Sequence, residues 1–448
     1  MSALRSEIRK MAALALPVAA TQLSTMALGV VDTVMVGRVS VEAMAAAALA
    51  NVWIFGTLMF MGGVLFGLDP IVAQAHGARD EERAARALQT GVGMALLLSV
   101  AVAWLWTETE RFLLLSGQDP ELVRMAAEYT FVQIPGIPFF LVYSALRQYL
   151  QAREHMRPAM WVILVANVLN VVANWALIFG HLGSPALGLL GAGIATTITR
   201  IFSCIGLIAY VRIFRLHDGA WVAWSRSALS PRALGALAAI GFPVAVQMAL
   251  EMWAFGAAAL LAGRLGAVAL AAHTVALNMA ALAFMLPLGI SQGAATRVGN
   301  LLGAGEPAAA QRAAWVSFAM GAGVMCLSAL LFVVLREWLP RLYTSELDVI
   351  AACAAVLPIA AAFQIFDGTQ VVGCGILRGM GRVRPAALFN LLGYWVLGLP
   401  IGGWLALRRG WGLAGIWWGL AGGLAVVAIA LVLFVRSRGP AVAEVRVY

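Results

Sequence analysis

Charged residues are scarce in this chain of 448 residues. They make up 11% of the sequence, whereas hydrophobic residues make up 62%. A soluble domain cannot bury so much apolar side chain, because a typical globular protein carries about 25% charged residues. The composition therefore excludes an ordinary soluble protein and indicates one that crosses a membrane several times.

Cysteine is also rare, and its placement excludes two common uses of it. The four cysteines, Cys204, Cys326, Cys353 and Cys374, each lie in an apolar segment, and no two of them form a CxxC pair. Neither a disulfide framework nor a zinc site is therefore expected.

Sequence motifs for ATP hydrolysis and metalloprotease chemistry are missing. The sequence contains no GxxxxGK[ST] and no HExxH. Serine-hydrolase chemistry is not expected either, and neither is a cofactor. We expect a protein that is not an enzyme and whose energy source is an ion gradient.

Twelve apolar runs are long enough to cross about 30 Å of hydrocarbon, which takes about 20 helical residues. A barrel would show short alternating strands instead, so the predicted fold is all-α. The runs lie near residues 11–36, 48–72, 88–107, 126–150, 159–180, 188–211, 236–262, 270–295, 314–335, 350–374, 386–407 and 412–435.

The net charge of +9 does not indicate a nucleic-acid partner, and the distribution of the basic residues instead predicts the orientation in the membrane. The basic residues are spread over short loops and form no patch. Most of them fall on one side if the N-terminus is cytoplasmic, which by the positive-inside rule predicts that both termini are cytoplasmic. The first apolar run is long enough to span and has a copy in mid-chain, so it is not interpreted as a signal peptide.

The two halves of the sequence repeat each other at an offset of 226 residues, from Pro17 to Pro243. Other matched pairs are Gly37 with Gly263, Gly63 with Gly289, Gly67 with Gly293 and Gly77 with Gly303. We predict two tandem six-helix lobes, residues 1–218 and 219–448. Six is even, so the lobes share one orientation and are related by a pseudo-two-fold axis along the membrane normal.

Leaving helix ends aside, three acidic residues lie within predicted spans: Asp32, Glu251 and Asp367. At about 1.5 Å per residue, Glu251 is roughly 18 Å from the inner end of its helix, and Asp367 reaches a similar depth. Two carboxylates at one depth would repel each other, so they are expected to share a proton or a cation. The alternative is neutralisation by an arginine within a span, such as Arg200 or Arg378.

A second polar group is expected in the first half. Asn170 and Asn174 are spaced i,i+4 on one helix face, and Asp32 and Thr196 could join them. Hydrogen bonds that merely hold helices together are an equally good interpretation.

Apolar residues surround the second-half acids in sequence. Met248, Met252, Trp253 and Phe255 flank Glu251, and Phe363 lies four residues before Asp367. They could line a cavity for flat cationic molecules. Lipid-facing packing is the commoner role for any one such residue.

Five features stand out together: VDTVMVGRVS at 31–40, AAHTVALN at 271–278, DGTQVVGCGILRG at 367–379, YWVLGLP at 394–400 and the carboxylate of Glu251. Together they resemble the multidrug and toxic compound extrusion (MATE) family, NorM-type branch. The resemblance covers all twelve spans. It implies a V-shaped pair of lobes that exports organic cations in exchange for H⁺ or Na⁺.

The resemblance also implies site residues. Glu251 and Asp367 resemble the family's second-lobe cation site, which would bind metal only if Na⁺ is the coupling ion. The first-lobe polar cluster would be Asp32, Asn170, Asn174 and Thr196, and the cavity candidates are Met248, Trp253, Phe255, Asn278 and Phe363. Phe363 stands where sodium-coupled relatives place a tyrosine, which favours protons.

The expected protein is a secondary antiporter for cationic drugs and dyes in a bacterial inner membrane, a monomer in contact with lipids. One alternative is a flippase for lipid-linked or polysaccharide precursors. Such a flippase would be expected to line its cavity with arginines, whereas the charges within spans here are mainly acidic. Another alternative is an uncoupled channel or membrane scaffold.

Overall fold

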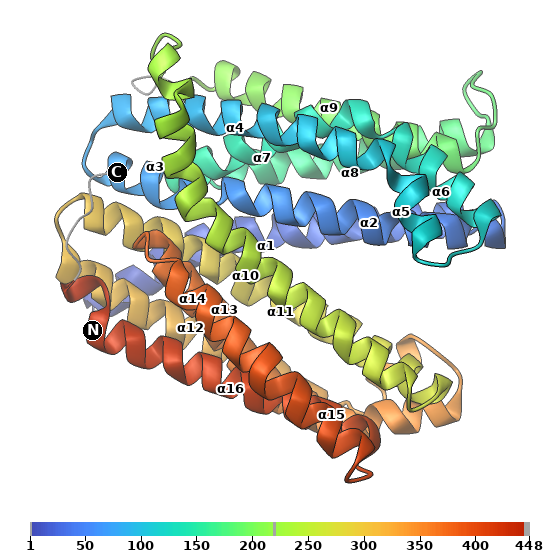
Figure 1. Ribbon diagram of the computed structural model, residues 1–448. Helices are drawn as coiled ribbons and strands as arrows, with labels where there is room; N and C mark the ends of the chain where they lie inside the picture. The colour runs from blue at the N-terminus through green and yellow to red at the C-terminus, as the bar shows by residue number, and fades with distance from the viewer. Residues whose placement is uncertain (1, 218–220, 443–448) are drawn as a thin grey trace. The chain divides into compact units, whose positions relative to one another are not determined.

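The computed structural model describes residues 2–217 and 221–442, and every regular element in these residues is a helix (Figure 1). Twelve helical stretches of this part of the chain are long and apolar enough to cross a membrane. They coincide with the twelve apolar runs, because a helix satisfies its own backbone hydrogen bonds in hydrocarbon. The predicted all-α fold is confirmed.

The helices follow one another with short connections. Those of the first half are α1 (Ser2–Val36), α2 (Val41–Leu65), α3 (Leu68–Gly77), α4 (Glu81–Thr107), α5 (Thr109–Leu115), α6 (Pro120–Phe131), η1 (Ile134–Gly136), α7 (Ile137–Ala152), α8 (Arg157–Phe179) and α9 (Leu189–Ile213). Those of the second half are η2 (Arg226–Leu229), α10 (Pro231–Gly263), α11 (Ala267–Gly303), α12 (Pro307–Val334), η3 (Leu339–Leu342), α13 (Leu347–Gly379), α14 (Arg384–Asn390), η4 (Leu391–Gly398), α15 (Leu399–Leu407), α16 (Gly412–Arg438) and η5 (Pro440–Val442).

Two of the spans are divided into shorter helices. In the fourth span, the 3₁₀ segment η1 separates α6 from α7, where Pro135 cannot donate a backbone hydrogen bond. In the eleventh span, the π-helix η4 connects α14 to α15. Gly398 at the end of η4 lies so close to α16 that an added Cβ would be 3.3 Å from the carbonyl oxygen of Gly419.

The packing of the chain defines two compact units. Unit 1 consists of Met1–Ala19, His76–Arg79 and Val246–Tyr448, and unit 2 consists of Ala20–Ala75 and Asp80–Ala245. These units are not the same division as the lobes predicted from the repeat. The first part of α1 packs in unit 1, and the first part of α10 packs in unit 2. The predicted boundary between residues 218 and 219 lies outside the described residues.

Paired glycines bring these exchanged helix halves into close contact in unit 2. A Cβ added to Gly63 of α2 would lie 2.8 Å from the Cα of Ala245, and one added to Gly67 would lie 2.8 Å from the carbonyl oxygen of Leu237. Ala245 and Leu237 both belong to α10. The GxxxG spacing of Gly63 and Gly67, at the end of α2 and just beyond it, therefore serves direct backbone contact with α10.

The repeat mates make the equivalent contact in unit 1. A Cβ on Gly289 of α11 would lie 2.6 Å from the carbonyl oxygen of Ala15, and one on Gly293 would lie 3.3 Å from the Cβ of Leu14. Ala15 and Leu14 belong to α1. In each unit, the first half of a long helix, α1 or α10, therefore packs against a pair of glycines.

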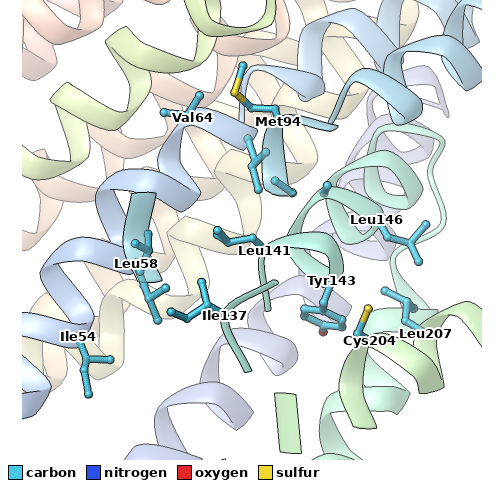
Figure 2. Packing of buried hydrophobic residues seen from close by; sticks show 14 of the residues in the cluster. Ile54, Leu58, Val64, Met94, Ile137, Leu141, Tyr143, Leu146, Cys204 and Leu207 are labelled. Carbon is cyan, nitrogen blue, oxygen red and sulfur yellow. The ribbon is translucent and has the colours of Figure 1, made fainter. Parts of the chain in front are cut away.

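Small and branched side chains fill the interior of unit 2. Figure 2 shows Ile137, Leu141 and Tyr143 of α7 in this cluster, together with Cys204 and Leu207 of α9. Ile137, Leu141 and Leu207 are fully buried. Close packing of this kind provides much of the helix–helix attraction in a membrane, where lipid is as apolar as the core.

Candidate functional site

Glu251 is held by two amide side chains in unit 1. The Nε2 of Gln370 on α13 donates to Oε2 of Glu251 at 3.3 Å, and the Nδ2 of Asn390 on α14 donates to the same oxygen at 3.5 Å. Gln370 also donates to the Oδ1 of Asn390 at 3.2 Å, and both amides are fully buried. Three helices thus converge on one carboxylate.

Asp367 lies one helical turn before Gln370 on α13. Its side chain is 4% exposed, and its Oδ1 has no hydrogen-bond partner. It is close enough to Glu251 for the two charges to repel.

Neither acid of unit 1 is neutralised by a basic side chain. The ion pairs within the described part of the chain, which join side chains 4.0 Å or less apart, include neither Glu251 nor Asp367. The alternative in which Arg200 or Arg378 pairs with them is therefore not what the structure contains. The polar neighbours of Glu251 are therefore the amides of Gln370 and Asn390 rather than a basic side chain.

An aromatic cluster packs against this pair. Phe255 of α10 lies 6.0 Å from Phe363 of α13 and 5.9 Å from Tyr394 of η4, measured between ring centroids. Phe363 also lies 5.6 Å from Trp417 of α16. Phe363, Tyr394 and Trp417 are fully buried.

Unit 2 brings together the other predicted polar residues. The Nδ2 of Asn174 donates to Oδ1 of Asp32 at 2.5 Å and to Oδ1 of Asn170 at 3.0 Å. The hydroxyl of Thr196 donates to the second oxygen of Asp32 at 3.5 Å. Asp32 of α1 thus joins α8 and α9 in one hydrogen-bonded group.

A basic residue that the sequence reading did not place in this group lies near Asp32. Arg200 is one turn beyond Thr196 on α9 and acts electrostatically on Asp32. Its guanidinium lies over the rings of Trp106 and Phe140, 5.7 and 5.6 Å from their centroids. Among the described residues, Asp32, Glu251 and Asp367 all lack a basic side chain within ion-pair distance, but the charge of Arg200 acts on Asp32.

The predicted cavity residues lie in different environments. Trp253 is 54% exposed and Asn278 is also exposed, whereas Met248 and Phe255 are half-buried. Phe363 is 1% exposed, between Phe255 and Trp417. A substrate could touch Phe363 only if the aromatic cluster opened.

Several residues of the unit 1 site were missed by sequence reasoning. Gln370 could have been found, because it follows Asp367 by three residues and so shares its helix face. Tyr394 and Trp395 lie in the recognised YWVLGLP segment, but nothing in that segment pointed to the acids. Asn390 gave no sequence signal at all.

A GxSxG pattern at residues 289–293 (GISQG) does not form a hydrolase site. Such a serine must stand on a sharp turn between a strand and a helix. Ser291 instead lies inside α11, is 2% exposed, and donates its hydroxyl to the carbonyl oxygen of Val371 at 2.7 Å. The glycines serve the contact with α1 described above.

Comparison with known proteins decides the family. The MatE family model matches residues 17–176 and 243–404, which lie in both sequence repeats. This chain belongs to the MATE family.

Relatives of this MATE chain match over nearly their whole length. It is 39% identical to the multidrug resistance protein NorM of Burkholderia vietnamiensis, covering 93% of this chain and 91% of that protein. It is 36% identical to the multidrug resistance protein PmpM of Pseudomonas aeruginosa, covering 96% and 91%. The resemblance drawn from the sequence motifs is confirmed.

Solved structures agree with this fold. The eukaryotic MATE transporter AtDTX14 matches with a TM-score of 0.89 and 25% identity over 98% of this chain and 97% of that one. A point mutant of the Vibrio cholerae MATE transporter VcmN matches with a TM-score of 0.88 and 19% identity over 98% and 100%. The predicted fold class is confirmed, and these neighbours are transporters.

Proposed function

We propose that this MATE-family chain is a multidrug efflux antiporter that exports lipophilic organic cations in exchange for inward-moving H⁺ or Na⁺. The names of relatives such as NorM, MdtK and PmpM support multidrug efflux and small-molecule substrates. The antiport step rests on the acids of unit 1.

One observation carries the proposed mechanism: Glu251 and Asp367 lie within reach of each other's charge and have no basic partner. Two unpaired carboxylates held together inside a membrane are costly, so they bind a proton or a cation in their stable state. A coupling ion and a cationic drug can then compete for the same negative charge. Antiport needs only that one conformation exposes this charge inward and the other outward.

Protons are the coupling ion that we favour. Phe363 offers no oxygen ligand beside Asp367, and its ring is enclosed by the rings of Phe255 and Trp417. A sodium ion needs several oxygen ligands, whereas a proton needs one carboxylate oxygen. The unpartnered Oδ1 of Asp367 suits the smaller requirement.

The remaining parts of the proposal follow from topology and relatives. We place the chain in a bacterial inner membrane with both termini in the cytoplasm, as a monomer in contact with lipid and without a cofactor. The division into two lobes at residues 218 and 219 is kept as a division by sequence repeat. A flippase for lipid-linked or polysaccharide precursors is not favoured, because the relatives are multidrug resistance proteins.

Transport in proteoliposomes tests the proposal directly. The purified protein is reconstituted, and dye movement is measured with a pH gradient alone, a sodium gradient alone and neither. We expect the pH gradient to drive accumulation of an ethidium-like dye and the sodium gradient not to. Dye movement that is indifferent to both gradients would instead support an uncoupled channel.

A further inference from the structure

Two further buried polar side chains of unit 1 take no part in the hydrogen bonds around Glu251. His273 of α11 is fully buried, and neither of its ring nitrogens has a hydrogen-bond partner. The side chain of Gln364 on α13 is equally buried, and both of its amide atoms are unpartnered. Buried polar groups without partners are rare and call for an explanation.

Contacts between side chains connect His273 to the acid pair. Its ring lies 5.6 Å from that of Trp417, whose indole nitrogen also has no partner. Trp417 in turn contacts Phe363. Gln364 lies one turn before Asp367 on α13 and so shares its helix face. The series continues through Phe255 to Tyr394, whose unpartnered hydroxyl lies in the electrostatic range of Glu251 and Asp367.

The series also runs along the helix axes. His273 is six residues, or about 9 Å, from the start of α11, and Trp417 is five residues from the start of α16. Glu251 is twelve residues, or about 18 Å, from the end of α10 at the same side of unit 1. His273 therefore lies about halfway between that side and the carboxylate, and the proposed topology makes it the outer side.

We propose that His273 is a proton relay between the outer face and the Glu251–Asp367 site, acting through internal water that hydrogen-bonds to Gln364, Trp417 and Tyr394. This inference rests on proton coupling as proposed above. Buried water typically hydrogen-bonds to polar groups that would otherwise be unsatisfied, and each of these side chains has a polar atom without a partner.

Imidazole is suited to the step because its two nitrogens do different work. In the neutral ring one nitrogen accepts and the other donates. A proton from water on the outer side binds the accepting nitrogen, and the proton on the other nitrogen leaves to water on the inner side. Rotation or tautomer exchange restores the neutral ring, so one proton has moved inward and no bond to carbon has changed.

The experiment separates proton delivery from conformational switching. Wild type, His273→Gln and His273→Phe are reconstituted, with Thr274→Val as the matched control. Thr274 is the adjacent residue, is exposed, and donates its hydroxyl to the carbonyl oxygen of Leu270 in its own helix. Each protein is assayed for ethidium binding in detergent, for dye-for-dye exchange at equal pH on both sides, and for transport driven by a pH gradient.

We expect both His273 variants to keep wild-type binding and exchange while gradient-driven transport slows at least about tenfold, since positioned proton-transfer groups contribute that much or more. Thr274→Val should match wild type in all three assays. Wild-type gradient-driven transport in His273→Gln would overturn the relay, and so would an equal loss of exchange and gradient-driven transport, which indicates a structural role. If the wild type itself shows no pH-driven transport, proton coupling fails and the relay fails with it.

Discussion

The indole nitrogen of Trp395 donates a hydrogen bond to the backbone carbonyl oxygen of Leu250 at 3.0 Å. Leu250 directly precedes Glu251 on α10, and Trp395 belongs to the π-helix η4. π-Helical segments are rare in proteins, and those that occur often lie at functional sites. This bond fixes the turn of α10 that carries Glu251 against the span that also supplies Asn390.

Replacing Glu251 with Gln should abolish ion-driven dye efflux. Glutamine keeps the size of the side chain and can still bond with Gln370 and Asn390, but it carries no charge for an ion and a drug to share. We expect efflux to fall to the level of cells without the transporter while the protein remains in the membrane. Ethidium efflux from cells, with membrane abundance measured by immunoblot, checks this.

The matched control for that variant is Asp348→Asn. Asp348 lies in the first turn of α13 and is exposed, so it loses the same charge away from the site. Its efflux should equal that of the wild type. Unchanged efflux in Glu251→Gln would defeat the assignment of this residue as the coupling site.

Replacing Asp32 with Asn should impair transport if the polar group of unit 2 takes part. Hydrogen bonds to a charged group contribute about 1.5–3 kcal/mol, and losing one such interaction corresponds to a fall of about 10- to 150-fold in rate or affinity. Thr33→Val is the control, because Thr33 is exposed and its hydroxyl bonds to the carbonyl oxygen of Gly29 in the same helix. Normal dye transport by Asp32→Asn would leave these residues with a packing role only.

Replacing Gly63 with Ala should destabilise the contact between α2 and α10. The added Cβ would meet the Cα and Cβ of Ala245 at 2.8 and 3.0 Å, and overpacking of this kind costs about 1–3 kcal/mol. Gly62→Ala is the control in the adjacent position, where a Cβ would meet nothing within 4 Å. Thermal unfolding in detergent should show a lower Tm for the first variant only, and equal Tm values would show that the helices yield at this contact.

The feature of the candidate site that could be predicted from the sequence is the depth of its acids in the membrane. The depth of Glu251 and Asp367 follows from counting residues along helices of constant rise, and the structure brings the two acids within reach of each other. Asn170 and Asn174 were also predictable as neighbours, because i,i+4 residues share one face of a helix. Counting could not show that Arg200 lies near Asp32, since that depends on how α9 is rotated against α1.

The burial of individual side chains could not be predicted from the sequence. Trp253 and Phe363 have similar sequence contexts, yet the first is 54% exposed and the second 1%. An apolar residue in a span is equally stable against lipid and against another helix, so hydropathy does not distinguish the two environments. His273 was identified only as part of a family motif, and its complete burial depends on the packing of α11 against its neighbouring helices, chiefly α13 and α12.

The sequence by itself determined the twelve spans, the tandem repeat and the presence of acids in the membrane. These properties depend on the hydrophobicity and charge of each segment alone, because those determine whether the segment is stable in a bilayer. Only the tertiary structure decided which amides surround Glu251, that the first halves of α1 and α10 pack in exchanged units, and where a π-helix replaces an α-helix. Those features depend on contacts between residues more than a hundred positions apart, and no local pattern specifies which faces of two distant helices meet.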